Sequence, residues 1–210
     1  MILIGQFDSP FVRRVAIALE LYNLPFEHRT WSTFGDADLL APFNPLRRVP
    51  TLILDNGETL IDSFAILDWL DETVGTDRAL IASKGPERRA ALKICALATG
   101  LADKAVSLHY EHILHKEVSD IWISRCRSQI ADVLAALDAD RAKRSTSWWF
   151  GDSIGHADIA VACALRFTRE AHAALFDLTV WPALNAHAAR CETLDSFRKI
   201  TQPLNSPKGA

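Results

Sequence analysis

Near residue 80 the hydrophobic pattern of the chain changes in kind. Before this point short apolar runs alternate with helical patterns, and after it every apolar pattern has helical spacing. A polar, irregular segment over 77–85 separates the two halves, and Pro86 suits the first turn of a new helix. Alternating strands and helices are typical of an α/β layer, whereas strand-free sequence is typical of a helical bundle. The sequence therefore predicts an α/β domain over 1–76 and an all-α domain over 86–202.

The first domain is predicted to hold a four-stranded mixed sheet with helices packed on it. Its strands are expected at 2–6, 26–29, 51–54 and 59–61, and its helices at 9–23, 33–41 (loop or short helix) and 63–74. Asn56-Gly57 is typical of a hairpin turn, and Gly75 suits a helix end. The second domain is predicted to hold helices at 87–115, 117–143, 155–174, 181–190 and 193–200. The tail from Gln202, which contains two prolines, is expected to hang loose.

Composition excludes several classes of function. The formal net charge is −3, from 23 basic and 26 acidic residues, which argues against a nucleic-acid-binding surface. No signal peptide is visible and no apolar run approaches the ~20 residues of a membrane span, so a cytoplasmic protein without membrane contact is expected. Cys95, Cys126, Cys163 and Cys191 are widely spaced and form no Cys-x-x-Cys pair. We expect four buried, reduced thiols rather than a zinc or dithiol site.

The segment Ser9-Pro10-Phe11-Val12-Arg13 follows the first predicted strand directly. Ser suits the cap position of a helix and Pro its first turn, because Pro lacks the N–H that would be left unpaired there. A helix start that carries a hydroxyl can also hold an anion. The residues alone leave both roles open for Ser9.

Two further motifs leave similar alternatives. A cis Val49-Pro50 bond would present the backbone of Val49 to a peptide-like ligand, although most such bonds are trans. Asp62-Ser63 begins the next predicted helix, where the two residues are caps or hold the carboxylate and ammonium groups of an amino-acid end.

The helical half carries one structural motif and one ambiguous cluster. Asp158, three residues after Gly155, is placed as the acid of a capping box, and Ile154 and Ile159 as a hydrophobic staple. His109, His112 and His115 lie near the end of the long helix, where a solvated helix end is favoured over a metal site, and no metal is expected. No Ser-His-Asp set, P-loop or dinucleotide fingerprint is visible.

Taken together, the motifs resemble the cytosolic glutathione transferase family over nearly the full length. They occur in the family's order: Ser9-Pro10-Phe11-Val12-Arg13, Asn44-Pro45 to Arg48-Val49-Pro50-Thr51-Leu52, Asp62-Ser63-Phe64-Ala65-Ile66, then Gly151-Asp152 with Ala157-Asp158-Ile159. The resemblance implies a thioredoxin-like domain followed by a helical bundle, usually as a homodimer. The details are most similar to an uncharacterised bacterial subgroup with the Ser-Pro-Phe opening.

The resemblance implies that Ser9 is the catalytic residue and donates a hydrogen bond to the sulfur of glutathione, the co-substrate. A free thiol titrates near 8.5, and a neighbouring donor or helix N-terminus lowers that value, which supplies more nucleophile at pH 7. The other residues assigned to glutathione are Val49 for the cysteinyl backbone beside a cis Pro50, Asp62 and Ser63 for the γ-glutamyl end, Arg48 for a carboxylate, and Phe34 at the border of the site.

Some residues depart from the family pattern. Ser9 stands where thiol-transferring members carry Cys, which argues against disulfide chemistry. Phe7 makes a Tyr-type site unexpected. Gly155 replaces a more usual Ser or Thr cap, so a weaker helix start is expected, and Asp62 is shorter than the usual Glu or Gln.

The electrophilic substrate is expected between the domains, with Phe11, Ala105, Leu108 and His112 as lining residues. Asp103 is a further candidate, for contact with the ligand of a partner subunit. The first hypothesis for function is a transferase that adds glutathione to a small electrophile. The alternatives are a protein of this fold that binds glutathione or a partner without turnover, and a glutathione-dependent isomerase or dehalogenase.

Overall fold

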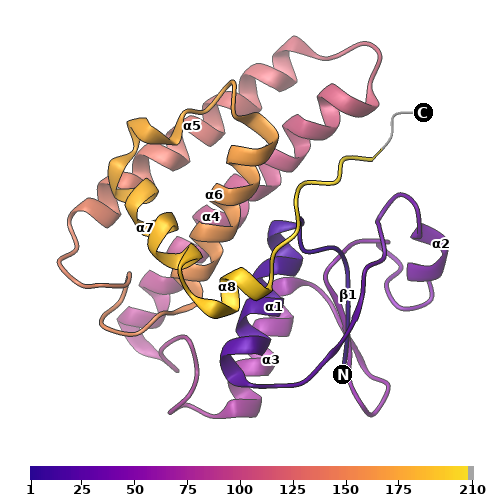
Figure 1. Cartoon of the computed structure of the whole chain (residues 1–210), viewed down its shortest axis with the longest axis vertical. Helices are drawn as coiled ribbons and strands as arrows, with labels where there is room; N and C mark the ends of the chain where they lie inside the picture. Colours follow the sequence, from indigo (N-terminus) through magenta and orange to yellow (C-terminus); the bar gives the residue numbers. More distant parts are fainter. Residues whose placement is uncertain (208–210) are drawn as a thin grey trace.

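The computed structural model describes residues 1–207, and Figure 1 shows a small sheet with its helices beside a bundle of longer helices. The sheet has the strand order β2-β1-β3-β4. β1 (Ile2–Ile4) runs parallel to β2 (Glu27–Arg29) and antiparallel to β3 (Thr51–Ile53), which pairs antiparallel with β4 (Thr59–Leu60). The helices of this part are α1 (Pro10–Tyr22), α2 (Ala37–Leu40) and α3 (Ser63–Val74).

Both faces of the sheet are covered, because successive side chains of a strand point to opposite sides. Leu3 of β1 is paired with Leu52 of β3, and both belong to the core that α1 and α3 share with the sheet. Ile4 and Ile53 belong to a smaller cluster with Leu40 of α2 on the other face. The loop between β1 and α1 therefore starts from a strand whose two faces are both packed against helices.

The helical part surrounds a second core. Its elements are α4 (Gly85–Leu114), α5 (Asp120–Ala142), α6 (His156–His172), the 3-10 helix η1 (Leu178–Val180), α7 (Pro182–Glu192) and α8 (Asp195–Lys199). α4 packs on both α5 and α6, and Trp149 in the connection to α6 is fully buried. No helix within 1–207 is long and apolar enough to cross a membrane.

Two polar networks join the halves. The Arg13 guanidinium of α1 donates to both carboxylate oxygens of Glu192 at 2.7 and 2.8 Å, and to the carbonyls of Ile200 and Phe197. On the opposite side, the Asp71 carboxylate of α3 accepts from the Tyr22 hydroxyl and contacts His156 Nε2 at 2.9 Å. Because Arg13, Asp71 and His156 are buried, their hydrogen bonds set how α1 and α3 sit against the helical half.

Most predicted elements are confirmed within two or three residues, and the helix at 63–74 agrees at both ends. The turn at 55–58 joins two antiparallel strands, as expected. The 3-10 helix η1 was not predicted. Gly155 has a specific reason to be glycine, since a Cβ there would lie 2.9 Å from the Leu80 carbonyl oxygen, which accepts the His156 N–H.

Candidate functional site

The site begins at the start of α1. Ser9 is the N-cap: its Oγ accepts from the Val12 N–H at 3.4 Å, and Pro10 occupies the first helical position. That contact is long for a hydrogen bond. The Ser9 hydroxyl proton has no acceptor among the described residues, so it is free to donate to a ligand at the positive end of the helix. The cap prediction is confirmed, and capping and ligand binding are compatible roles for the same oxygen.

Gly5 allows the segment before β3 to approach the start of α1. A Cβ on Gly5 would lie 2.5 Å from Val12 Cγ2 and 2.8 Å from Val49 Cβ, and its φ of +131° disfavours any other residue. The Val49-Pro50 bond is cis, as the resemblance implies. Neither the N–H nor the C=O of Val49 is hydrogen-bonded within the described chain. This free backbone lies in the connection that precedes β3, an interior strand of the sheet.

Sequence reasoning missed a role for Asn44. Its buried amide donates to the Arg48 carbonyl at 2.8 Å and to Thr51 Oγ1 at 3.1 Å, while its oxygen accepts the Leu46 N–H. Asn44 thus holds the loop that carries Arg48 and Val49. The signal was present as Asn44-Pro45 in the motif, but only the fold shows what the amide reaches.

Arg48 and Phe34 lie on two separate loops that border the cavity described below. Arg47 pairs with Asp38 at 2.8 Å, whereas the exposed side chain of Arg48 has no carboxylate partner in the described part of the chain. Phe34 is exposed and its ring meets Tyr110 of α4 edge-on, with centroids 5.2 Å apart. The rim therefore offers one free cation and an aromatic edge.

Asp62 and Ser63 lie at the start of α3. Asp62 Oδ1 accepts the Phe64 N–H at 2.9 Å, which confirms that it is a cap, and Ser63 is buried. Neither residue lines the cavity described below, so a ligand that touched Ser9 and the start of α3 would have to extend beyond that cavity past Val49.

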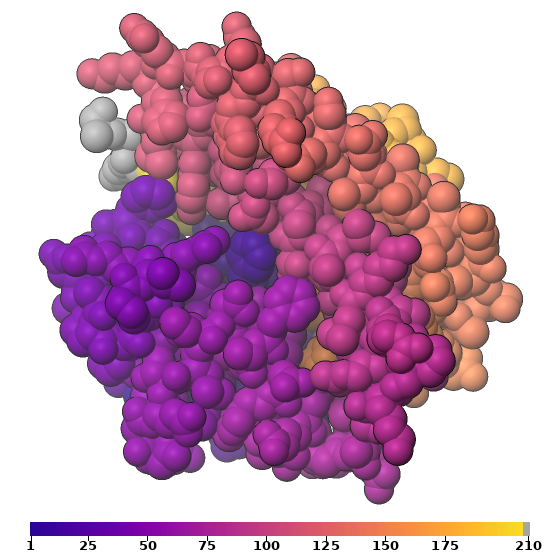
Figure 2. All heavy atoms as spheres, turned by 180° about the vertical axis from the view of Figure 1, so that it is seen from behind, coloured from indigo at the N-terminus to yellow at the C-terminus, as the bar shows by residue number. Residues whose placement is uncertain are grey.

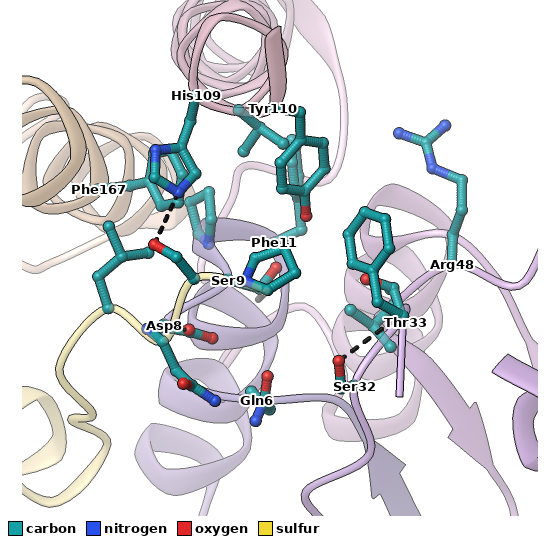
Figure 3. Close-up of a pocket in the computed structure, with 18 of the residues that line it drawn as sticks. Gln6, Asp8, Ser9, Phe11, Ser32, Thr33, Arg48, His109, Tyr110 and Phe167 are labelled. Atoms are coloured by element: carbon teal, nitrogen blue, oxygen red, sulfur yellow. Dashed lines mark hydrogen bonds between the residues drawn. The ribbon is translucent and has the colours of Figure 1, made fainter. Parts of the chain in front are cut away.

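The two halves meet along a furrow, at whose floor Figure 2 shows indigo atoms from the N-terminal segment. A cavity of about 330 Å³ lies between them. Its walls combine polar and apolar residues of both halves: Gln6, Asp8, Ser9, Pro10, Phe11, Trp31, Ser32, Thr33, Phe34, Arg47, Arg48, Val49, Val106, His109, Tyr110, Phe167, Leu204, Asn205, Ser206 and Pro207. Figure 3 shows Ser9 and Phe11 on one side with His109, Tyr110 and Phe167 above them.

The predicted lining of α4 is wrong by about one residue along the helix. Phe11 lines the cavity as expected, but Ala105 and Leu108 are fully buried in the helical core, and His112 is exposed. Val106, His109 and Tyr110 face the cavity instead. The periodicity identified an inner face, but α4 packs on both α5 and α6, and the most apolar stripe faces those helices.

His109 is buried, which overturns the expectation of a solvated helix end for this residue. Burial lowers the pKa of His109, with the nearby His172 acting in the same direction. Its Nε2 lies 2.9 Å from Ser206 Oγ. His112 and His115 are exposed, and His115 Nδ1 contacts Glu111 at 2.9 Å. No group of three or more His, Cys, Asp or Glu that would suit a metal occurs among the described residues.

The prediction of a loose tail is also wrong. Leu204, Asn205, Ser206 and Pro207 form part of the cavity wall. Asp103, by contrast, does not line the cavity; its carboxylate lies 2.9 Å from Lys104 Nζ. All four cysteines are free and buried, as predicted.

Comparison with known proteins agrees with this geometry. Residues 3–78 match the glutathione S-transferase N-terminal domain and residues 120–190 match its C-terminal domain. The GST-like protein YibF of Escherichia coli K12 is 30% identical over 171 residues, which cover 80% of this chain and 81% of YibF.

Solved structures extend the likeness to the whole chain. A glutathione S-transferase from Methylobacterium radiotolerans, in complex with glutathione sulfonate, is 28% identical with a TM-score of 0.89 over 98% of both chains. A bacterial maleyl pyruvate isomerase of the zeta class is 25% identical with a TM-score of 0.81 over 100% of both chains.

Fold and site together define a two-domain protein with a thioredoxin-like N-terminal domain and a helical C-terminal domain. The chain belongs to the glutathione S-transferase family. The predicted family and fold class are confirmed.

Proposed function

We propose that this protein is a glutathione transferase in which the Ser9 hydroxyl stabilises the glutathione thiolate for attack on a small electrophile. The observation that carries the proposal is the position of Ser9: a hydroxyl with a free proton, at the N-terminus of a helix, in the wall of a cavity between two domains. A hydrogen-bond donor and the helix dipole both favour the anionic form of a thiol. Each unit by which the thiol pKa falls corresponds to about 1.4 kcal/mol of preferential stabilisation.

The remaining contacts to glutathione are proposed to come from residues on either side of Ser9. The unpaired backbone of Val49 suits the cysteinyl unit, which would add to it as an extended strand. Asp62 has one carboxylate oxygen left for an ammonium group, and the start of α3 supplies N–H groups near Ser63 for a carboxylate. Arg48, without an ion-pair partner, suits the second carboxylate, with Phe34 at the border.

The electrophile is proposed to occupy the aromatic side of the cavity. Phe11, Val106 and Phe167 supply an apolar surface there, as is usual for small-molecule sites. In the reaction the thiolate sulfur forms a bond to the electrophilic carbon, and the bond from that carbon to a halide breaks or an epoxide ring opens. The leaving group or ring oxygen takes the electron pair.

The proposal is tested by Ser9→Ala with Ser9→Thr as the matched control. Ser9→Ala is expected to return the thiol pKa of bound glutathione toward about 8.5, and to lower kcat/KM at pH 7 by roughly tenfold or more. Ser9→Thr retains the hydroxyl and is expected to stay close to wild type. The thiolate is measured by its ultraviolet absorbance as pH is varied, and turnover with halogenated, epoxide and peroxide substrates. Unchanged thiol pKa and turnover in Ser9→Ala would reduce Ser9 to a helix cap.

Isomerisation is the second candidate, because the zeta-class maleyl pyruvate isomerase matches the whole chain. The two reactions differ in what becomes of glutathione. A transferase consumes it in proportion to product, whereas an isomerase returns it, so the free thiol remaining after turnover separates them. Tight binding without turnover of any substrate would instead favour a binding protein.

We also propose that the protein acts as a cytoplasmic homodimer. Four buried, free thiols suit a reducing compartment. Phe64 of α3 and Leu92 of α4 are large apolar side chains left exposed on neighbouring helices, which suits a second copy. Asp103 is proposed to reach the partner subunit's ligand.

A further inference from the structure

The segment 5–8 connects β1 to the helix start that carries Ser9. Gln6 and Ser9 line the cavity (Figure 3), whereas Gly5 and Phe7 are not among the described residues that line it. The Ser9 N–H donates to the Gln6 carbonyl at 3.2 Å, so the backbone of this segment is tied to the position of Ser9. The groups that hold Gly5 and Phe7 behind the cavity therefore affect where the Ser9 hydroxyl points.

His28 of β2 holds this segment at two points. Its Nε2 lies 2.7 Å from the Gly5 carbonyl oxygen, and because a carbonyl can only accept, Nε2 carries the proton and donates the hydrogen bond. The His28 ring is stacked on the Phe7 ring, with centroids 3.8 Å apart and planes 6° from parallel. One side chain thus contacts the residues on both sides of Gln6.

The hydrogen bond from His28 takes the place of a further backbone bond between the strands. The parallel ladder of β1 and β2 closes with the Gly5 N–H, which donates to the Arg29 carbonyl at 2.9 Å. β2 ends at Arg29, and within 1–207 the Gly5 carbonyl receives no backbone N–H. Because Gly5 is buried, its carbonyl depends on the His28 side chain for a donor.

The helix start alone holds the Ser9 hydroxyl loosely. The cap contact between Ser9 Oγ and the Val12 N–H is 3.4 Å, which is long for a hydrogen bond. A catalytic group that is misplaced by roughly 1 Å can lose about a hundredfold in rate. The segment before Ser9 therefore has to supply the precision that the cap contact does not.

We propose that His28 is a positioning residue for the Ser9 hydroxyl. Its hydrogen bond to Gly5 and its stack on Phe7 keep segment 5–8 in the shape that aims the hydroxyl at the glutathione sulfur. The inference rests on the proposed function. His28 is not among the described residues that line the cavity, so it acts through this segment and not on the ligand. An imidazole suits the task because it offers a flat ring and an N–H donor together.

His28→Phe keeps a flat ring against Phe7 and removes the donor, so it tests the hydrogen bond alone. It is expected to raise the thiol pKa of bound glutathione by about half a unit to one unit, which lowers kcat/KM at pH 6.5 by roughly three- to tenfold. The Kd of glutathione should stay within about twofold of wild type, because the contacts proposed for its backbone and carboxylates are retained. The thiolate is measured by its ultraviolet absorbance as pH is varied.

Two further variants are matched to His28→Phe. His28→Gln, whose amide can donate to the Gly5 carbonyl, is expected to recover most of the lost thiolate and turnover. Glu27→Ala, at an exposed position of the same strand, is the control and should keep the thiol pKa of wild type. Phe7→Leu removes the stack and keeps the hydrogen bond, and it is also expected to raise the thiol pKa. The test therefore stands even if His28→Phe does not fold.

The Ser9→Ala background shows whether His28 acts through Ser9. In that background His28→Phe is expected to cause no further change in the thiol pKa, because no hydroxyl is left to position. An equal shift in both backgrounds would overturn the inference. Urea unfolding of the same variants records any loss of stability separately from the thiol pKa.

The outcomes separate this inference from the proposed function. If His28→Phe and Phe7→Leu lose stability but keep the thiol pKa of wild type, while Ser9→Ala raises it, His28 is only a structural residue and the role of Ser9 stands. If Ser9→Ala leaves the thiol pKa unchanged, the proposed function fails and this inference fails with it.

Discussion

At the scale of single residues, Arg13 and Arg14 are neighbours in sequence that differ in whether their buried guanidinium groups are hydrogen-bonded. Both are buried. Arg13 is fully paired with Glu192 and two backbone carbonyls, whereas Arg14 has no hydrogen-bond partner among the described residues and lies over the Phe64 ring, 4.6 Å from its centroid. Burial lowers the pKa of Arg14. A buried charge without a partner is costly, so only Arg13 is expected to stabilise the folded chain.

Replacement of each arginine by methionine makes this difference measurable. Arg13→Met is expected to lower the free energy of unfolding by about 3 kcal/mol, because it leaves buried acceptors and a carboxylate unpaired. Arg14→Met, which retains an apolar side chain of similar length, is expected to be neutral or stabilising. Urea unfolding of the two variants and wild type provides the values. Equal losses for both variants would show that Arg14 finds a partner that a single chain does not supply.

At the scale of elements, the start of α6 is the most tightly specified junction. Asp158 is 1% exposed and accepts the Gly155 N–H at 2.9 Å and the Trp149 N–H at 2.8 Å. The predicted role of Asp158 as the acid of a capping box is therefore confirmed, and the same carboxylate also holds the connection that buries Trp149. Gly155 lies close to the Leu80 carbonyl, so this junction ties the linker to the helical domain as well.

Removal of the Asp158 carboxylate is expected to destabilise the folded chain strongly. Asp158→Ala leaves two buried N–H groups without acceptors, and we expect it to lower the free energy of unfolding by about 3–5 kcal/mol. Asp152→Ala, at an exposed position nearby, is the control and should change stability by less than about 0.5 kcal/mol. Chemical denaturation compares them. A small effect of Asp158→Ala would mean that water satisfies both groups after the junction loosens.

At the scale of the whole molecule, the buried side chain of His187 contributes to the response to acid, against an opposite contribution from Asp158, whose pKa burial raises to about 6. His187 is buried against the Trp149 ring, with centroids 5.2 Å apart. Burial, assisted by the Arg141 charge, lowers the pKa of His187 to about 4 from 6.5. The unfolded chain therefore binds the proton more tightly between these two values. The stabilisation is complete above pH 6.5 and is lost as the pH falls toward 4.

The wild-type protein is accordingly expected to lose about 3 kcal/mol of unfolding free energy from this one group between pH 7 and pH 4. His187→Gln, which does not titrate, should show a flatter dependence over the same range, whatever its stability at pH 7. Urea unfolding at a series of pH values provides both curves. Parallel curves would assign the acid sensitivity to other groups.

Assembly is the second prediction at this scale. Figure 2 shows the face where purple α3 lies beside magenta α4, and the exposed side chains of Phe64 and Leu92 lie on these helices. Sedimentation at micromolar concentration is expected to give a dimer, and Leu92→Glu a monomer, because a carboxylate cannot be buried there without a partner. Leu39→Glu, at an exposed position of α2, is the control and should remain dimeric. A wild-type monomer would overturn the proposal.

Local patterns determined most of what could be predicted. The strand and helix positions, the Asn-Gly turn, the Ser9 and Asp62 caps and the Asp158 capping box follow from spacing and from groups a few residues apart. The resemblance to the family predicted the cis Val49-Pro50 bond, which composition and spacing left undecided. The contacts of glutathione at Ser9, Phe34, Arg48, Val49, Asp62 and Ser63 remain predictions.

Only the tertiary structure decided which residues enclose the cavity. Val106, His109 and Tyr110 replaced the predicted lining of α4 because the direction of a helix face depends on what packs against its other sides. The place of residues 204–207 in the cavity wall was invisible in the sequence, since their partners Asp8, His109 and Glu170 lie far away along the chain. By itself the sequence determined the helix start at Ser9 through local geometry, and the order of its motifs indicated the family and with it the fold. The part of the cavity wall made by α4 and residues 204–207 depends on long-range contacts, which a local sequence pattern does not predict.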